Sequence, residues 1–159
     1  MHKRKTLRSL AALGLAASLP FGWTAAAAAA DAKPFKIAFI LPMTGQSAST
    51  GRQEEAAVKL FLAQNGTTVA GRKVEVIIKD DAGVADTTRR IAQELVVNDK
   101  VDVLAGFGLT PLALATAPIA TQSKTPMVVT AAATSMITEQ SPYIVRTSFT
   151  LPQVTVSIA

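Results

Sequence analysis

Two short apolar segments, Val101–Ala105 and Met127–Ala131, constrain the fold of this chain more than any other feature. Each is rich in valine and too short for an ordinary helix, which is typical of strands buried on both faces. The Ala/Leu/Ile-rich stretch between them has the length of a helix. Strand, helix and strand in this order predict a right-handed crossover between two parallel strands of one sheet.

Each of these two strands is followed by small residues and then by a threonine that can start a helix. Thr110-Pro111 follows the segment Gly106-Phe107-Gly108-Leu109, and Thr134-Ser135 follows Ala131-Ala132-Ala133. Threonine is a good N-cap, and proline is well tolerated at the first helical position. Two helix N-termini are therefore expected side by side at the carboxyl edge of the sheet, where open α/β sheets bind their ligands.

The rest of the chain alternates in the same way. We expect strands at Lys36–Pro42, Lys73–Lys79 and Tyr143–Thr147, a loop at Met43–Gly51, and helices near Arg52–Gln64, near Thr87–Asn98 and from Leu151 onward. This alternation predicts an α/β fold, a doubly wound parallel sheet in three αβα layers. Ala57, Leu60 and Phe61 share one helical face that we expect to be buried, and Asp86 is the expected cap of the helix that follows it.

Residues 1–30 have the parts of a secretory signal. A basic start precedes an uncharged run from Ser9 through Trp23, and an alanine tract offers A-x-A cleavage sites up to Ala30. An uncleaved membrane anchor is the alternative, since Ser9–Ala30 is nearly long enough to span a bilayer. Pro20 and the weakly apolar alanines favour a cleaved signal. We therefore expect an exported, periplasmic protein.

Residues 31–159 are expected to form one ligand-binding lobe. The chain stops inside the apolar helix that begins near Leu151, with no cap and no loop after it. A domain rarely stops at such a point, so we expect the lobe to be truncated.

Composition argues against several classes of function. Four of the 16 Lys and Arg residues precede residue 9, so the mature chain nearly balances its 11 Asp and Glu, and no nucleic-acid partner is expected. The chain has no cysteine, and its one histidine is His2, so the common catalytic triads and thiolate metal sites cannot be built. We expect neither an enzyme nor a cofactor or metal; an enzyme with a doubly wound fold is the rival interpretation.

Two motifs have both a chemical and a structural interpretation. Asp80-Asp81 could be a catalytic carboxylate pair, but adjacent residues of a strand point to opposite faces, which favours a turn with side-chain caps. Gly106-Phe107-Gly108 lacks the third glycine and the acidic residue of a dinucleotide loop. Thr110 and Thr134 remain as candidates for binding a small carboxylate, with ordinary helix capping as the alternative.

The same segments carry a family resemblance. The sequences IAFILPMTGQSASTG, VEVIIKDDAG, VLAGFGLTPLALATAPIA and PMVVTAAATS resemble strand–loop–helix units of the periplasmic solute-binding proteins of branched-chain amino acid ABC importers, the Leu/Ile/Val-binding type. The resemblance extends from about Phe35 to Ala159. It implies a type I periplasmic-binding fold, in which a small ligand binds between two lobes that close over it, and a membrane permease as partner.

The resemblance also implies roles for individual residues. The hydroxyl of Thr110 and the hydroxyl and amide of Thr134 would bind the α-carboxylate of an amino acid. The carbonyl of Ala132 would accept a hydrogen bond from its α-ammonium, and Gly108 and Leu109 would line the pocket.

One position departs from the family pattern. The family often has an aromatic residue where this chain has Thr50, packed on an aliphatic side chain of the ligand. The ligand is therefore open between branched-chain or other amino acids, amides and aromatic acids. A ligand-sensing domain of a membrane receptor is a further alternative, which would require that Ser9–Ala30 is not cleaved.

Overall fold

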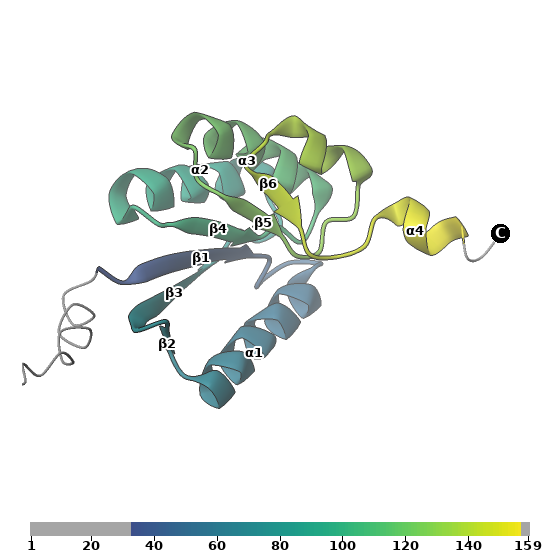
Figure 1. Cartoon of the computed structure of the whole chain (residues 1–159). Helices are drawn as coiled ribbons and strands as arrows, with labels where there is room; N and C mark the ends of the chain where they lie inside the picture. The colour runs from purple at the N-terminus through teal and green to yellow at the C-terminus, as the bar shows by residue number, and fades with distance from the viewer. Residues whose placement is uncertain (1–32, 157–159) are drawn as a thin grey trace, which may run out of the picture.

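A computed structural model describes residues 33–156, which form a sheet flanked by helices (Figure 1). The strands are β1 (Phe35–Leu41), β2 (Thr68–Val69), β3 (Arg72–Asp80), β4 (Val103–Gly106), β5 (Met127–Val129) and β6 (Ile144–Arg146). The helices are α1 (Ala48–Asn65), α2 (Ala85–Glu94), α3 (Thr110–Ser123) and α4 (Leu151–Thr155), with a π-helical turn η1 (Leu95–Asp99) and a 3₁₀-helix η2 (Ser135–Gln140). The expected signal at residues 1–30 lies outside the described residues.

The six strands lie in the order β2-β3-β1-β4-β5-β6. All neighbours are parallel except β2, a short strand that the sequence analysis missed and that pairs antiparallel with β3. Helix α1 covers one face of the sheet, and α2 and α3 cover the other (Figure 1). The α/β fold with a doubly wound sheet is thus confirmed. Because the chain continues from β1 to β3 on one side and then to β4 on the other, the topological switch point lies between β1 and β4.

The core lies between the sheet and the pair α2 and α3. Leu104, Met127 and Val129 are fully buried on the strands that the valine-rich segments predict. Alanines at positions 113, 117 and 120 of α3 are buried as well, and their small side chains let the helix approach the sheet closely. This face therefore has the packing expected of a parallel sheet buried by its crossover helices.

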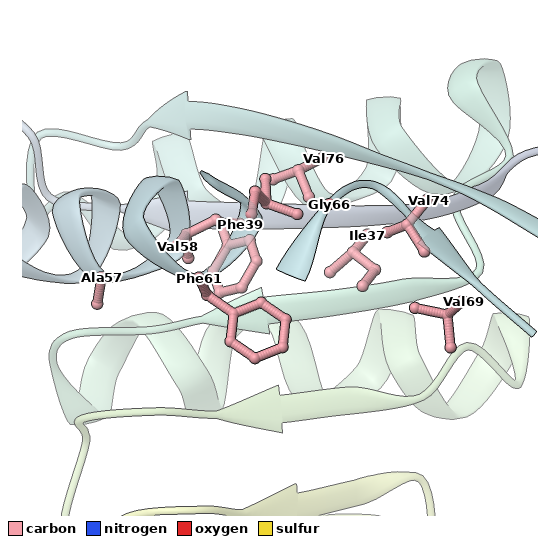
Figure 2. A pocket seen from close by; sticks show the side chains of 10 residues that line it. Ile37, Phe39, Ala57, Val58, Phe61, Gly66, Val69, Val74 and Val76 are labelled. Carbon is pink, nitrogen blue, oxygen red and sulfur yellow. The ribbon is translucent and has the colours of Figure 1, made fainter. Parts of the chain in front are cut away.

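The opposite face is only partly covered, and here one prediction was wrong. Leu60 and Phe61 of α1, expected to be buried, are 58% and 61% exposed, and Ala57 is exposed as well. Among the described residues, α1 is the one helix on this face. An apolar groove of about 400 Å³ runs between α1 and the strands, and Figure 2 shows Phe61 reaching toward Phe39 across it.

Several element ends differ from those expected. Helix α1 begins at Ala48 rather than near Arg52, so Thr50 lies in its first turn and not in a loop. A Cβ at Gly51 would lie 2.4 Å from the carbonyl oxygen of Pro42, so glycine is what allows this helix to begin against the preceding loop. Helix α2 begins at Ala85, so Asp86 lies in the first turn instead of capping it.

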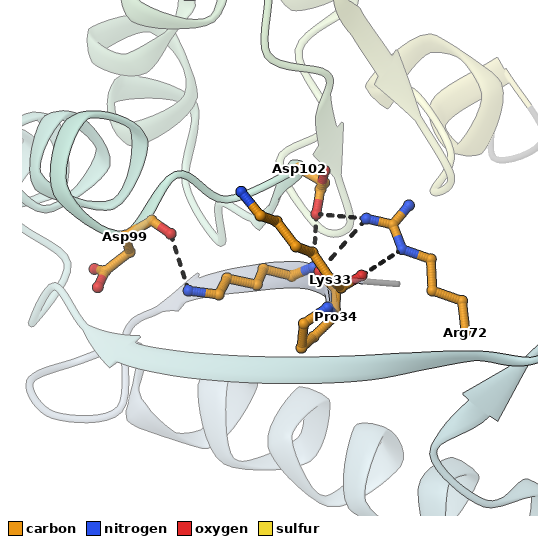
Figure 3. A network of polar contacts seen from close by, with 6 residues as sticks. Lys33, Pro34, Arg72, Asp99 and Asp102 are labelled. Carbon is orange, nitrogen blue, oxygen red and sulfur yellow. Dashed lines mark hydrogen bonds and ion pairs between the residues drawn. The ribbon is translucent and has the colours of Figure 1, made fainter. Parts of the chain in front are cut away.

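The amino edge of the sheet is closed by a polar network around Arg72 (Figure 3). Arg72 Nε donates to the carbonyl of Lys33 at 2.8 Å, and its Nη2 lies 3.9 Å from Asp102 Oδ2. The same carboxylate oxygen accepts from the backbone N–H of Lys36 at 2.8 Å. These bonds hold together the starts of β1 and β4. No helix within residues 33–156 is both long enough and apolar enough to cross a membrane.

Candidate ligand-binding site

The structure brings Thr110 and Thr134 together at the carboxyl edge of the sheet. Their Oγ1 atoms are 2.7 Å apart and form a half-buried hydrogen bond, although 24 positions separate the two residues. The cause is the parallel pairing of β4 with β5, which places the starts of α3 and η2 next to each other. One proton is used within the pair, and the other hydroxyl proton is available to an acceptor outside it.

Neither hydroxyl caps its own helix. The N-cap of α3 is Leu109, not Thr110, and it makes no side-chain capping bond. Thr134 is the N-cap residue of η2 but also makes no side-chain capping bond. Thr110 is therefore not the cap that the sequence predicted, whereas Thr134 has the predicted N-cap position but makes no side-chain capping bond. Of the two starts, only α3 is a full helix, and its dipole adds partial positive charge beside Thr110.

The backbone between β4 and α3 is bent at the switch point. Gly106 and Phe107 both have positive φ, 109° and 69°, and the Phe107 side chain is fully buried. The N–H of Phe107 donates to the carbonyl of Ile40 at 3.1 Å, and its carbonyl accepts from the N–H of Ala132 at the same distance. A left-handed conformation is costly for a bulky residue and persists only where the surrounding contacts impose it. These contacts join the ends of β1, β4 and β5 into one rigid edge.

The loop after β5 is held by a residue that the sequence analysis missed. Arg146, the last residue of β6, donates from Nε to the carbonyl of Ala132 at 3.1 Å and from Nη2 to the carbonyl of Thr134. The resemblance assigns the carbonyl of Ala132 to the α-ammonium of an amino acid, but this carbonyl already accepts one hydrogen bond, from Arg146. A basic residue near the end of the expected strand Tyr143–Thr147 was the available signal, but only the pairing of β6 with β5 shows what it contacts.

The other predicted residues lie around this pair in different ways. Gly108 is half-buried against Pro42, whose Cγ would be 3.0 Å from a Cβ at this position. Leu109 is 39% exposed, and its side chain points toward Gly83 in the loop after β3. Thr50 is half-buried in the first turn of α1, and among residues 33–156 no side-chain hydrogen bond joins it to the threonine pair.

The turn expected at Asp80-Asp81 is confirmed, and the two carboxylates serve different partners. Asp81 is fully buried and accepts from the N–H of Gly83 at 2.9 Å and from the hydroxyl of Thr88 at 2.8 Å. Asp80 accepts from the loop after β1, at 2.8 Å from the N–H of Met43 and 2.7 Å from the hydroxyl of Thr44.

Asp80 therefore connects the loops that follow β1 and β3. Slight burial acts to raise the pKa of its carboxyl, but the hydrogen bonds from Ala82, Thr44 and Met43 outweigh it and lower the pKa below the ordinary value. The bonds favour the charged form because every donor points at the carboxylate oxygens.

Glu54 reaches the carboxyl edge from α1. Its Oε2 is hydrogen-bonded to the hydroxyl of Thr130, directly after β5, and its Oε1 is buried with no partner among the described residues. Burial raises the pKa of Glu54, and the bond from Thr130 acts in the opposite direction. This carboxyl is the acidic group nearest to the end of β5 that the hydrogen bonds reveal.

Residues 34–159 match the sequence model of a family described as periplasmic binding protein. The chain belongs to the periplasmic binding protein family. Because this is a family of binding proteins, the prediction that the chain is not an enzyme is confirmed, and so is the resemblance on which the site residues were chosen.

Individual relatives bind different ligands. The chain is 42% identical, over 99% of its length, to "Leu/Ile/Val-binding protein homolog 6" of Brucella abortus. It is 64% identical to a solute-binding protein of an ABC transporter from Rhodopseudomonas palustris BisB5, solved with 3,4-dihydroxybenzoic acid, at a TM-score of 0.75 over 76% of this chain and 33% of that one. A leucine-binding protein from Thermotoga maritima is 29% identical, with a TM-score of 0.73 over 77% of this chain and 35% of that one.

The chain covers 38% of the length of the Brucella relative. In the two solved structures, the aligned part is likewise about one third of the molecule. The residues described above therefore correspond to only part of such a protein.

Proposed function

We propose that this chain supplies the first lobe of the solute-binding component of an ABC importer, and that it captures a small carboxylate in the periplasm for a membrane permease. The ligand that we favour is an aromatic acid of the hydroxybenzoate class. The carboxylate binds at Thr110 and Thr134, and Gly108, Leu109 and Thr50 lie at the border of the site. Residues 1–30 are expected to direct export and to be removed by cleavage close to Ala30.

The hydroxyl pair is the observation that carries this proposal. The Oγ1 atoms of Thr110 and Thr134 lie 2.7 Å apart at the carboxyl edge, beyond the ends of β4 and β5, and neither makes a side-chain capping bond. Hydroxyl groups that are not used for capping, beside the positive end of α3, are suited to a carboxylate oxygen. The buried, bent backbone around Phe107 keeps the pair in place before a ligand arrives, which reduces the entropy lost on binding.

The choice among ligands rests on two further observations. The relative solved with 3,4-dihydroxybenzoic acid is 64% identical, far above the 29% of the leucine-binding protein. The carbonyl of Ala132, which an amino acid would use for its ammonium, already accepts a bond from Arg146. An aromatic acid needs no acceptor at that position. Amino acids remain the second candidate, favoured by the 42% identity to the Leu/Ile/Val-binding homolog.

Calorimetric titration of the protein at its full native length tests the proposal. The ligands are 3,4-dihydroxybenzoate, leucine and 3,4-dihydroxybenzamide, which keeps the ring but has no charged carboxylate. We expect micromolar or tighter binding of 3,4-dihydroxybenzoate, and binding of the amide at least tenfold weaker. Tighter binding of leucine would replace the aromatic acid by the second candidate, and equal binding of acid and amide would contradict a carboxylate site.

A further inference from the structure

Arg146 is the one guanidinium that the described structure places on the loop after β5. It lies at the end of β6, opposite Val129 of β5 in the register of the parallel pair. From there it bonds the carbonyls of both Ala132 and Thr134, two residues apart. The planar guanidinium has donors in a fixed fork, so it can hold two acceptors at a set separation, which an ammonium group cannot do.

Side-chain bonds of Thr130 and Thr134 hold the two ends of this loop, and the backbone supplies further bonds. The N–H of Thr130 donates to Gly106 at 2.9 Å, the N–H of Ala132 to Phe107 at 3.1 Å, and the N–H of Leu151 to the carbonyl of Ala133 at 2.9 Å. These bonds anchor the start and the middle of the loop. At its end, the carbonyl of Thr134 accepts from Arg146 and, at 3.3 Å, from the N–H of Ile137 within the short helix η2.

The charge of Arg146 is also unusual for a half-buried group. Within residues 33–156, its guanidinium forms no ion pair with a carboxylate, in contrast to Arg72, which faces Asp102. Its positive charge therefore acts on the loop that carries Thr134 without an ion-pair partner among the described residues, and the carboxyl of Glu54 bonds Thr130 at the other end of that loop. A partly buried charge is screened less than an exposed one, so an anion at the threonine pair benefits from it.

We propose that Arg146 is a positioning residue for the bound carboxylate, acting through Thr134. By fixing the carbonyl of Thr134, it sets the direction of the Thr134 hydroxyl toward Thr110, and its charge favours an anion at that pair. This inference rests on the proposed function. It assigns a binding role to a residue outside the loops in which the threonines lie.

The test compares Arg146→Met and Arg146→Lys with Arg72→Met in the full-length protein. Arg72 is a matched control, since its Nε also donates to a backbone carbonyl, but at the opposite edge of the sheet. We expect Arg146→Met to weaken binding of 3,4-dihydroxybenzoate at least tenfold, and Arg146→Lys to weaken it by an intermediate factor, because the charge stays while the fork is lost. Arg72→Met should change binding less than twofold.

A double variant separates positioning from a general loss of structure. If Arg146 acts through Thr134, then Arg146→Met combined with Thr134→Ala weakens binding by much less than the product of the two separate factors. The free energies of unfolding of the ligand-free variants should show no such coupling. If Arg146→Met does not fold, Arg146→Lys with Thr134→Ala gives the same comparison, since lysine keeps the charge and most of the stem.

The inference and the proposed function fail in different ways. Wild-type protein that binds neither 3,4-dihydroxybenzoate nor leucine would contradict the proposed function. Wild-type protein that binds 3,4-dihydroxybenzoate, together with an Arg146→Lys variant that binds it equally well, would overturn the role of the fork. If the double variant weakens binding by the product of the factors of the two single variants, the action of Arg146 through Thr134 would be overturned.

Discussion

Each edge of the sheet has an arginine that donates hydrogen bonds to backbone carbonyls, but the two arginines differ in their charged neighbours. At the amino edge, Arg72 donates to the carbonyl of Lys33 and lies beside the carboxylate of Asp102. At the carboxyl edge, Arg146 donates to two loop carbonyls and, among the described residues, has no carboxylate within ion-pair distance. The arginine of the first edge lies beside a carboxylate, whereas, within residues 33–156, the arginine of the second edge bonds only the carbonyls of the loop that carries Thr134.

This difference separates a structural network from a binding network. A polar group whose partners all come from the protein stabilises the fold and has little left for a ligand. Thr110 and Thr134, by contrast, make no side-chain capping bond and use only one hydroxyl proton between them, so the other proton is left for an acceptor outside the pair. The carboxyl edge is also the more tightly bent one, because Gly106 and Phe107 have positive φ there. Changes at this edge should therefore affect binding as well as stability, and changes at the amino edge should affect stability alone.

The largest effect is expected from Gly106→Ala at the carboxyl edge. A Cβ there would lie 2.3 Å from the carbonyl oxygen of Ile40, and the backbone has φ of 109°. Strain and overpacking together should lower the free energy of unfolding by about 3 to 5 kcal/mol. Urea denaturation of the variant and the wild type measures this difference.

Gly66→Ala is the matched control for that prediction. Gly66, after the end of α1, also has positive φ, but a Cβ there would meet nothing within 4 Å. Its cost should be the strain alone, about 1 to 3 kcal/mol. Equal losses at the two glycines would mean that the close contact with Ile40 relaxes, and that the carboxyl edge is less rigid than described.

Thr134→Ala should have the next largest effect, and mainly on binding. A hydrogen bond to a charged carboxylate contributes about 1.5 to 3 kcal/mol, so affinity for 3,4-dihydroxybenzoate should fall by about 10- to 150-fold. The unfolding free energy of the ligand-free protein should change by only about 1 kcal/mol, since one neutral hydrogen bond to Thr110 is lost. Thr68→Ala, an exposed position on β2, is the control that should change neither quantity.

Equal losses in binding and folding would restrict Thr134 to a structural role. Calorimetric titration gives the first quantity and urea denaturation the second. The comparison between the edges would then lose its main support, because the carboxyl edge would be stabilised in the same way as the amino edge.

The sequence allowed the sheet and its carboxyl edge to be predicted, because periodicity and length depend on neighbouring residues alone. The valine-rich strands, the crossover helix and the nearness of Thr110 to Thr134 all follow from local pattern plus the rule for parallel strands. The buried face of α1 was predicted from its own periodicity, but burial depends on what else packs there. Leu60 and Phe61 border an open groove among the described residues, so periodicity alone could not place them.

The roles of Arg146 and Glu54 were also beyond the reach of local pattern. Each makes its contact across the sheet, Arg146 from the next strand and Glu54 to Thr130, which is 76 positions away. Such contacts depend on register, and register is decided by the whole sheet. The capping interpretation of Thr110 was wrong for a related reason, since the neighbouring Thr134 provides its hydroxyl with a partner outside the helix.

Asp80→Asn should have a smaller effect, on the loops that border the carboxyl edge. Asparagine replaces one acceptor oxygen by a donor group that faces the hydroxyl of Thr44, so about 1 kcal/mol of stability should be lost at pH 7. The pKa of Asp80 is lowered in the folded protein, so its contribution is present above the ordinary value of 3.8 and is lost as pH falls through the lowered pKa. Asp86→Asn, whose side chain is 92% exposed, is the control. The unfolding free energy, measured from pH 7 downward, should fall with pH in the wild type and in the Asp86 variant. It should fall less in the Asp80 variant.

The smallest effect concerns Glu54, where α1 meets the carboxyl edge. Burial raises its pKa above the ordinary value of 4.5, so the folded protein binds more protons than the unfolded chain in the window between 4.5 and the raised pKa. The contribution of Glu54 to stability therefore falls as pH rises through that window. Glu54→Gln removes this dependence, so the variant should lose less stability than the wild type between pH 4.5 and 7. The difference should be small, because the hydrogen bond from Thr130 opposes the effect of burial. Glu55→Gln is the matched control, since Glu55 pairs on the surface with Lys59 at 2.7 Å. A Glu54 variant that follows the wild-type pH profile would mean that this carboxyl is solvated in solution, and that α1 does not close against the end of β5.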